Sequence, residues 1–286
     1  MPTRILTNAE IKVLTGNGSA SDVLVEMWND AATELVCALL EVTDIAKHQV
    51  VDERVKVLSA YELIFEQFPV DTDQTITLKT LFDGTAITGY TFRKDPQRLR
   101  TVRLYNVAGN VPYPLNYDGI FATYTAGWNV QDTLTVLSLT GLADKTITVT
   151  IAGVATTWTI KASGATGNQI NVGLTTDATA TAIAAALGGA AVGSVVTLPL
   201  GSKVLLGTAT TAQFTIVNAD VPVALKNCVA LIAGGGIAEK SKAGGVVSYT
   251  IGGKTLSFRN DKEANAVQTL INTWIATYKK VKIFAV

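Results

Sequence analysis

The chain opens with helical periodicity and then changes to strand-like alternation. Between residues 21 and 41, apolar side chains recur every three or four positions, which predicts a helix with a buried stripe of Leu24, Trp28, Ala31, Leu35 and Leu39. Ser21 or Ser19 can cap its start. From about 48 to 128, β-branched and aromatic residues alternate with polar ones in runs separated by turn signals. These runs predict an antiparallel sheet.

The composition shifts abruptly near residue 133. Between 133 and 218, threonine, alanine, valine and glycine dominate, and the only charged residues are Asp144, Lys145, Lys161, Asp177 and Lys203. The pattern within this segment predicts a hairpin over 145–160, a small helix that Asp177 or Thr176 caps and Gly188 ends, and three further strands. We therefore expect an inserted, β-rich accessory domain over 133–219.

After residue 219 the chain again has helical and hairpin signals. Pro222 is expected to open a helix over 221–233, and the three glycines at 234–236 are expected to stop it. Strand-like alternation around Gly252-Gly253 predicts a tight hairpin, and 261–280 reads as an amphipathic helix. The expected fold is α+β, with helices packed on an antiparallel sheet. Its core comprises 1–132 and 220–286, and the accessory domain interrupts it.

Composition and charge narrow the classes of function. Lysine plus arginine equals aspartate plus glutamate at 23 each, so no overall field draws the protein to DNA or to an anionic membrane. Only 16% of residues are charged and 48% are hydrophobic, which is more typical of a subunit buried in an assembly than of a soluble monomer. No apolar run has the length of a signal peptide or of a membrane span, so export and membrane insertion are disfavoured.

The residues that usually carry chemistry are sparse. His48 is the only histidine, and Cys37 and Cys228 lie on the apolar sides of separate predicted helices, where buried thiols are expected. The pairs Asp52-Glu53 and Asp71-Asp73 could hold a cation or act as acid and base, but they lack a calcium-loop spacing and are interpreted as turn residues. The sequence thus predicts no catalytic, metal or cofactor-binding residue, and no enzyme activity.

One segment looks like a phosphate-binding loop. Residues 248–255 end in Gly-Lys-Thr, as a P-loop does, but Ser248 stands where the motif requires glycine. A P-loop is also followed by a helix whose N-terminus faces the phosphates, whereas Leu-Ser-Phe here predicts a strand. The segment is therefore interpreted as a hairpin turn.

Basic residues gather before residue 104. The cluster comprises Arg93, Lys94, Arg98, Arg100 and Arg103. Such a run is usually a solvated strand face, and Asp95 interrupts it. The alternative is a basic face for DNA or for a neighbouring subunit, and both readings stay open from the sequence.

The order of elements and several short motifs resemble the head-tail connector (adaptor, head-completion) family of tailed bacteriophages. In that family a strand reading apolar-x-x-Tyr-x-Ala-Gly-aromatic precedes a helix opened by proline. Here Tyr124, Ala126, Gly127 and Trp128 match the strand, Pro222 matches the helix start, and 236–249 matches the following connection to the hairpin. The resemblance covers about 1–128 and 220–286, and the segment between them departs from the family pattern.

The resemblance implies a structural role in the virion neck, after synthesis in the host bacterial cytoplasm. A connector of this family forms a ring, typically dodecameric, below the portal protein, and it presents a surface to a tail-completion or tail-terminator protein. Packaged DNA passes through its lumen without sequence-specific binding, and neither a membrane nor a cofactor is involved. The alternative reading is another virion structural component, such as a tail-completion or baseplate protein.

The chain end and the inserted module supply two further hypotheses. The last seven residues are unusually apolar for a terminus, and we expect them to dock on the portal; the alternative is that they cover the subunit's own core. This tail comprises Lys280, Val281, Lys282, Ile283, Phe284, Ala285 and Val286. The inserted module is expected to contact capsid, tail or a neighbouring subunit, with a passive spacer or a glycan-binding domain as alternatives.

Overall fold

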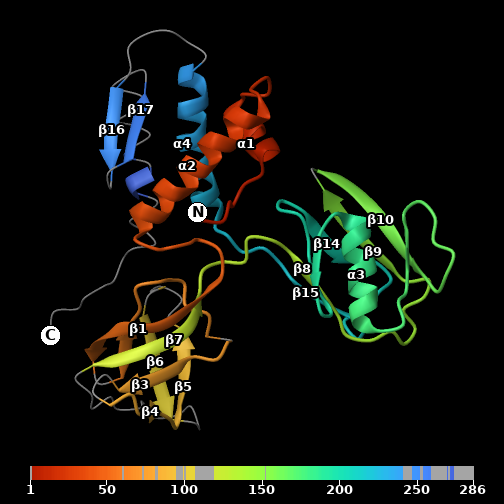
Figure 1. Ribbon diagram of the computed structural model, residues 1–286, viewed down its shortest axis with the longest axis horizontal. Coiled ribbons are helices and arrows are strands. Elements are labelled where there is room, and N and C mark those ends of the chain that lie inside the picture. The colour runs from red at the N-terminus through yellow and green to blue at the C-terminus, as the bar shows by residue number, and fades with distance from the viewer. Residues whose placement is uncertain are drawn as a thin grey trace. The chain divides into compact units, whose positions relative to one another are not determined.

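The computed structural model describes residues 2–59, 61–72, 74–80, 83–94, 99, 101–106, 119–151, 153–240, 247–251, 254–258, 269 and 271–273. The chain divides into two compact units, which we call unit 1 (Met1–Trp128 with Pro222–Val286) and unit 2 (Asn129–Val221). Unit 1 combines helices with antiparallel sheets, and unit 2 combines a helix with two sheets that are antiparallel apart from one strand pair (Figure 1), so the predicted α+β class is confirmed.

Three helices of unit 1 pack side by side: α1 (Asn8–Thr15), α2 (Asp22–Leu40) and α4 (Val223–Lys240) (Figure 1). A capping box starts α1, because the Thr7 hydroxyl accepts from the Glu10 backbone N–H at 3.1 Å and the Glu10 carboxylate accepts from the Thr7 N–H at 2.7 Å. Two of the otherwise unpaired donors of the first turn are thereby satisfied.

The buried face of α2 differs from the predicted stripe. Ser21 caps the helix, as one of the two expected residues, but Ala31 is exposed and Trp28 is only half-buried. The buried face includes Asn29, whose Nδ2 donates to the Leu6 carbonyl at 2.8 Å. A polar residue can occupy the interior when a hydrogen bond compensates its desolvation, and apolar spacing alone cannot reveal such a residue.

Helix α4 continues through the glycines that were expected to stop it. It runs to Lys240, so that prediction was wrong. The cause is helix packing: a Cβ at Gly234 would lie 2.7 Å from Cγ2 of Thr15, at the end of α1. Gly234 therefore permits the close approach of two helices. Its backbone stays helical and does not adopt the left-handed conformation with which a glycine commonly ends a helix.

The larger sheet of unit 1 is a seven-stranded, curled half-barrel with the order β4-β3-β7-β1-β2-β6-β5, and every neighbouring pair is antiparallel. Its inner face is a continuous apolar core that includes Leu63, Val102 and Ile120. The strands are β1 (His48–Ser59), β2 (Glu62–Ile64), β3 (Thr77–Thr80), β4 (Ala86–Ile87), β5 (Tyr90–Lys94), β6 (Thr101–Asn106) and β7 (Ile120–Ala126).

The final hairpin of unit 1 consists of β16 (Val247–Ile251) and β17 (Lys254–Phe258). The strands pair from Val247 with Phe258 to Ile251 with Lys254. Because a strand follows Lys254 directly, a P-loop geometry is excluded here and the hairpin prediction is confirmed. Residues 269 and 271–273 are helical and Ile271 is buried, while the rest of the predicted helix over 261–280 lies outside the described residues.

Unit 2 has two small sheets and one helix around its own core. One sheet has the order β11-β10-β9-β14, with a parallel β10–β11 pair, and the other has the order β12-β13-β8-β15. Helix α3 (Thr176–Leu187) ends at Gly188 as predicted, but its N-cap is Thr175, not Asp177 or Thr176. The strands are β8 (Thr133–Val136), β9 (Thr146–Ile151), β10 (Val154–Lys161), β11 (Gln169–Asn171), β12 (Ala190–Val192), β13 (Val195–Thr197), β14 (Lys203–Leu206) and β15 (Phe214–Val217).

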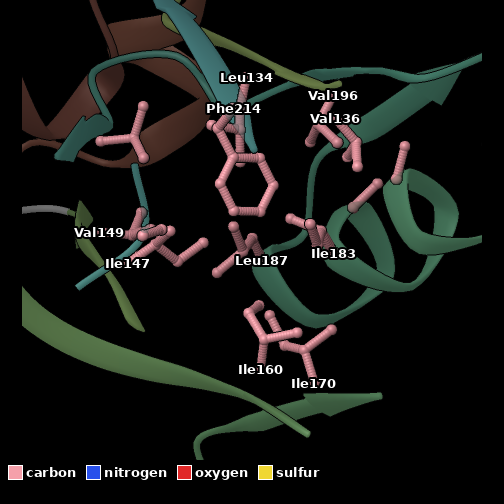
Figure 2. Close-up of a cluster of buried hydrophobic side chains, with 14 of the residues drawn as sticks. Leu134, Val136, Ile147, Val149, Ile160, Ile170, Ile183, Leu187, Val196 and Phe214 are labelled. Atoms are coloured by element: carbon pink, nitrogen blue, oxygen red, sulfur yellow. The ribbon is translucent and has the colours of Figure 1, made fainter. Parts of the chain in front are cut away.

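The core of unit 2 is built around one aromatic ring. Figure 2 shows Phe214 of β15 between aliphatic side chains of α3, such as Ile183, and of β9, such as Val149. Phe214 has no solvent exposure. A module this poor in charge therefore has an apolar core of its own, which is the requirement for an independently folded domain.

The chain enters and leaves unit 2 at neighbouring positions. Strands β8 and β15 pair from Thr133 with Val217 to Val136 with Phe214. Asp132, only 2% exposed, accepts from the Val204 N–H at 3.0 Å through one carboxylate oxygen and from the Ala219 N–H at 2.7 Å through the other. One buried carboxylate thus joins the first and last segments of the unit to β14.

Candidate functional site

The predicted hallmark strand is a structural corner of unit 1. Tyr124 is 1% exposed in β7, and its hydroxyl donates to the Glu53 carboxylate at 2.7 Å and accepts from the Gln67 N–H at 3.2 Å. Burial, together with the hydrogen bond to the negative Glu53, raises the pKa of Tyr124 far above its ordinary value. The phenol therefore stays protonated and ties β7 to β1 and to the segment after β2.

The residues after Tyr124 make the corner compact. Ala126 is fully buried, and Gly127 has φ +101°. The backbone of Trp128 is bound on both sides, with its N–H donating to Ile45 O at 2.8 Å and its carbonyl accepting from Lys47 N at 2.9 Å. All of these contacts are architectural, so the motif positions the end of β7 and carries no chemistry of its own.

The structure describes three residues of the predicted basic cluster, and it separates Lys94 from Arg93 and Arg103. Arg93 of β5 and Arg103 of β6 are directly opposite each other on one face of the seven-stranded sheet. Arg93 lies over the Tyr105 ring at 4.6 Å, and Arg103 is 2.6 Å from the Glu62 carboxylate. Lys94 stands opposite Val102, one register position away from Arg93. Arg98 and Arg100 lie outside the described residues.

Sequence reasoning missed three other cations on that face. Arg54 and Lys56 of β1 and Lys79 of β3 are far from the cluster in the chain, but the register brings them onto the same side of the sheet. The signal was present in the alternation of β1, where buried Val55 separates the two exposed cations. What could not be read from the sequence was which strands are neighbours.

A second surface that sequence reasoning missed lies on the helices of unit 1. Val13 and Val23 are 81% and 79% exposed, and Leu14 and Met27 are also exposed. The end of α1 and the start of α2 are joined by an ion pair between Lys12 and Asp22 at 2.9 Å, next to these residues. We call this surface the apolar helix patch: Val13, Leu14, Val23 and Met27. Exposed apolar groups in such a cluster are typical of interaction surfaces.

The residues that could have held a metal or acted as acid and base have structural partners. His48 binds the Ala46 carbonyl through Nδ1 at 2.8 Å, and Asp71 pairs with Lys47 at 2.6 Å. Glu53 is bound by Tyr124 and by the Glu66 N–H at 2.8 Å. Within the described part of the chain, no group of three or more metal-binding side chains comes together. Asp73 lies outside that part.

The two cysteines are free and buried, in α2 and α4. Burial raises the pKa of the Cys37 thiol to about 12, with a further contribution from the negative charge of Asp44, and burial alone raises the pKa of Cys228 to about 12. Both sulfurs are therefore thiols at neutral pH and have little nucleophilic character.

This burial predicts slow modification of both thiols in the native protein. With a pKa of about 12, a thiol at pH 8 is thiolate in only about one molecule in ten thousand, which together with burial should suppress reaction. We expect a disulfide reagent to label neither cysteine over an hour at pH 8, and to label both at once in guanidinium. Rapid labelling of either native thiol would show that its helix opens.

The C-terminal tail, Lys280 to Val286, lies outside the described residues, so its predicted docking stays a prediction. Among the described helices, none is both long and apolar enough to cross a bilayer. Among the described residues, two surfaces are candidates for carrying function: the apolar helix patch and the cationic side of the sheet. Comparisons of the chain with models of protein families, with curated proteins and with solved structures found no match.

Proposed function

We propose that this chain is a structural head-to-tail connector (adaptor) of a tailed bacteriophage. Copies of it would form a ring below the portal, extend the DNA channel and offer a surface to a tail-completion or tail-terminator protein. The role requires interfaces and no chemical step. Three features support the proposal: the order of elements that resembles the connector family, a surface suited to self-association, and the junction at the end of β7.

The observation that carries the proposal is the apolar helix patch. Val13 and Val23 expose most of their side chains, and each would contribute roughly 2 kcal/mol if a neighbour buried it fully. They stand at the end of α1 and the start of α2, where an ion pair joins Lys12 to Asp22; most of the Asp22 side chain is exposed, so this pair adds little to the stability of the surface. In a ring, this surface of each copy would meet a different, complementary surface of the next copy.

The hallmark corner supports the same role in a different way. Gly127 and Trp128 join β7 to the segment that follows α2, through the hydrogen bond from Trp128 N to Ile45 O. The segment after α2 is thereby connected to the sheet by a short junction, in which Trp128 is bound to both Ile45 and Lys47. Such a junction suits a subunit that must hold a fixed orientation relative to its neighbours in a closed ring.

Self-association of the purified chain tests the proposal. We expect Val23→Glu, and separately Val13→Lys, to shift the sedimentation velocity profile from an oligomer to one copy at about 50 µM, because a charge cannot be buried in the interface without a partner. Both sites are exposed, so the circular dichroism spectrum should not change. The matched control is Val154→Glu on β10 of unit 2, which is also exposed and should leave the oligomer intact.

Two results would contradict this assignment. One is a wild-type chain that stays a single copy at every concentration tested, alone and with a portal ring added. The other is an oligomer that Val23→Glu and Val154→Glu weaken equally, because the interface would then not involve the apolar helix patch.

A further inference from the structure

One face of the seven-stranded sheet gathers cations from strands that are distant in sequence. Phe121 of β7 lies between two of these cations in the strand register, with Lys79 of β3 opposite it on one side and Arg54 of β1 on the other. Farther along the sheet, Arg93 of β5 is opposite Arg103 of β6. Lys56 is two residues from Arg54 and shares its face. We call this surface the cationic face: Arg54, Lys56, Lys79, Arg93 and Arg103.

The opposite side of the same strands is the apolar core. Val55, Leu78, Val102 and Leu104 alternate with the cations along their strands and are buried. Arg54, Lys56 and Arg93 are exposed. Alternation therefore directs these charges to the side of the sheet away from its apolar core.

Acidic residues neutralise only part of this charge. Asp52 lies 3.3 Å from Lys79, and Glu62 lies 2.6 Å from Arg103. Within the described residues, neither Arg54 nor Lys56 has an ion pair. The face is thus locally positive on a chain whose overall charge is zero, so the attraction it exerts is confined to this surface.

We infer that the cationic face binds the phosphate backbone of duplex DNA without reading its sequence. The cations stand on four of the seven strands, β1, β3, β5 and β6; neighbouring strands are about 4.8 Å apart, and side chains on one face recur about every 6.7 Å along a strand. DNA offers a regular row of anions, one per about 3.4 Å of axis on each strand, whereas carboxylates on a protein surface are irregularly placed. The inference rests on the proposed function only for the presence of DNA beside the subunit.

The same face has little with which to read bases. The Tyr105 ring, which could otherwise stack on a base, is covered by the Arg93 guanidinium at 4.6 Å. Among the described residues, the members of the cationic face all lie on β-strands, and none is on a helix that could enter a major groove. Contacts to phosphates position a protein on DNA and carry no sequence information, which suits DNA that moves past the subunit.

Fluorescence anisotropy with labelled duplexes of unrelated sequence, each about 30 base pairs, tests the inference. We expect Arg54→Glu combined with Lys56→Glu to weaken binding at least about tenfold at low salt, and to lower the slope of log affinity against log salt by about 2. Arg54→Gln with Lys56→Gln should give a smaller loss in the same direction. The matched control places the same charge change on unit 2, with Lys145→Glu and Lys203→Glu, and should leave the affinity unchanged.

Three outcomes would overturn the inference: no binding by the wild type up to about 100 µM at low salt, an equal loss in the control variant, or preference for a polyglutamate tracer over DNA. The last result would assign the face to an acidic protein surface. Sedimentation of the same samples separates the two proposals. If the protein forms oligomers that do not bind DNA, the proposed DNA binding by the cationic face is contradicted and the proposed ring is not. If single copies bind DNA, the proposed ring is contradicted and the DNA binding is not.

Discussion

Replacing Gly127 with alanine is expected to destabilise unit 1 by about 4 kcal/mol or more, and the soluble yield should fall accordingly. An added Cβ would stand 2.4 Å from the Ala46 carbonyl oxygen and 2.6 Å from its carbon, both of them backbone atoms. The backbone at φ +101° also lies in a region that residues with a Cβ rarely adopt. Urea unfolding of the purified variant measures the loss.

The control for this substitution is Gly84→Ala, in the turn between β3 and β4 of the same sheet. Gly84 also has a positive φ, +69°, but nothing lies within 4 Å of its Cβ position. Its replacement should cost only the backbone strain of about 1–2 kcal/mol. If the two variants were equally stable, the collision at Ala46 would be relieved by a small shift, and the corner would not be rigid.

Asp132→Ala is expected to destabilise unit 2 by about 2–6 kcal/mol, at about 1–3 kcal/mol for each of the two donors left without an acceptor. The donors are the Val204 and Ala219 N–H groups, each of which donates to one carboxylate oxygen of Asp132. Hydrogen exchange measured by mass spectrometry should show faster exchange throughout 129–221, with unit 1 unaffected.

Asp132→Asn should fall between the wild type and the alanine variant, because the amide keeps one acceptor oxygen and turns its NH₂ toward the other donor. The matched control is Asp144→Asn, which removes an exposed negative charge paired with Lys161 at a position of positive φ that asparagine tolerates, and it should cost no more than about 1 kcal/mol. Equal exchange in Asp132→Ala and the wild type would mean that other groups close the base of unit 2.

Much of the secondary structure could be predicted because its causes are local. The β9–β10 hairpin, α3 with its stop at Gly188, and the β16–β17 hairpin each follow from alternation or capping within a short segment. The capping box at Thr7 and Glu10 is an equally local signal, and it would have identified α1. Local signals failed at Gly234, where the glycine serves contact with Thr15 and the helix continues.

The sequence by itself determined the α+β class, most strands, and the outward alternation of cations along each strand, because these depend on neighbours along the chain. Only the tertiary structure decided which strands lie beside one another, and thereby joined Arg54, Lys56 and Lys79 to the cluster at Arg93 and Arg103. It also decided that Val13 and Val23 stay exposed while Asn29 is buried. Burial depends on contacts between residues that are distant in the sequence, and the hydrophobic periodicity of a segment does not identify those contacts.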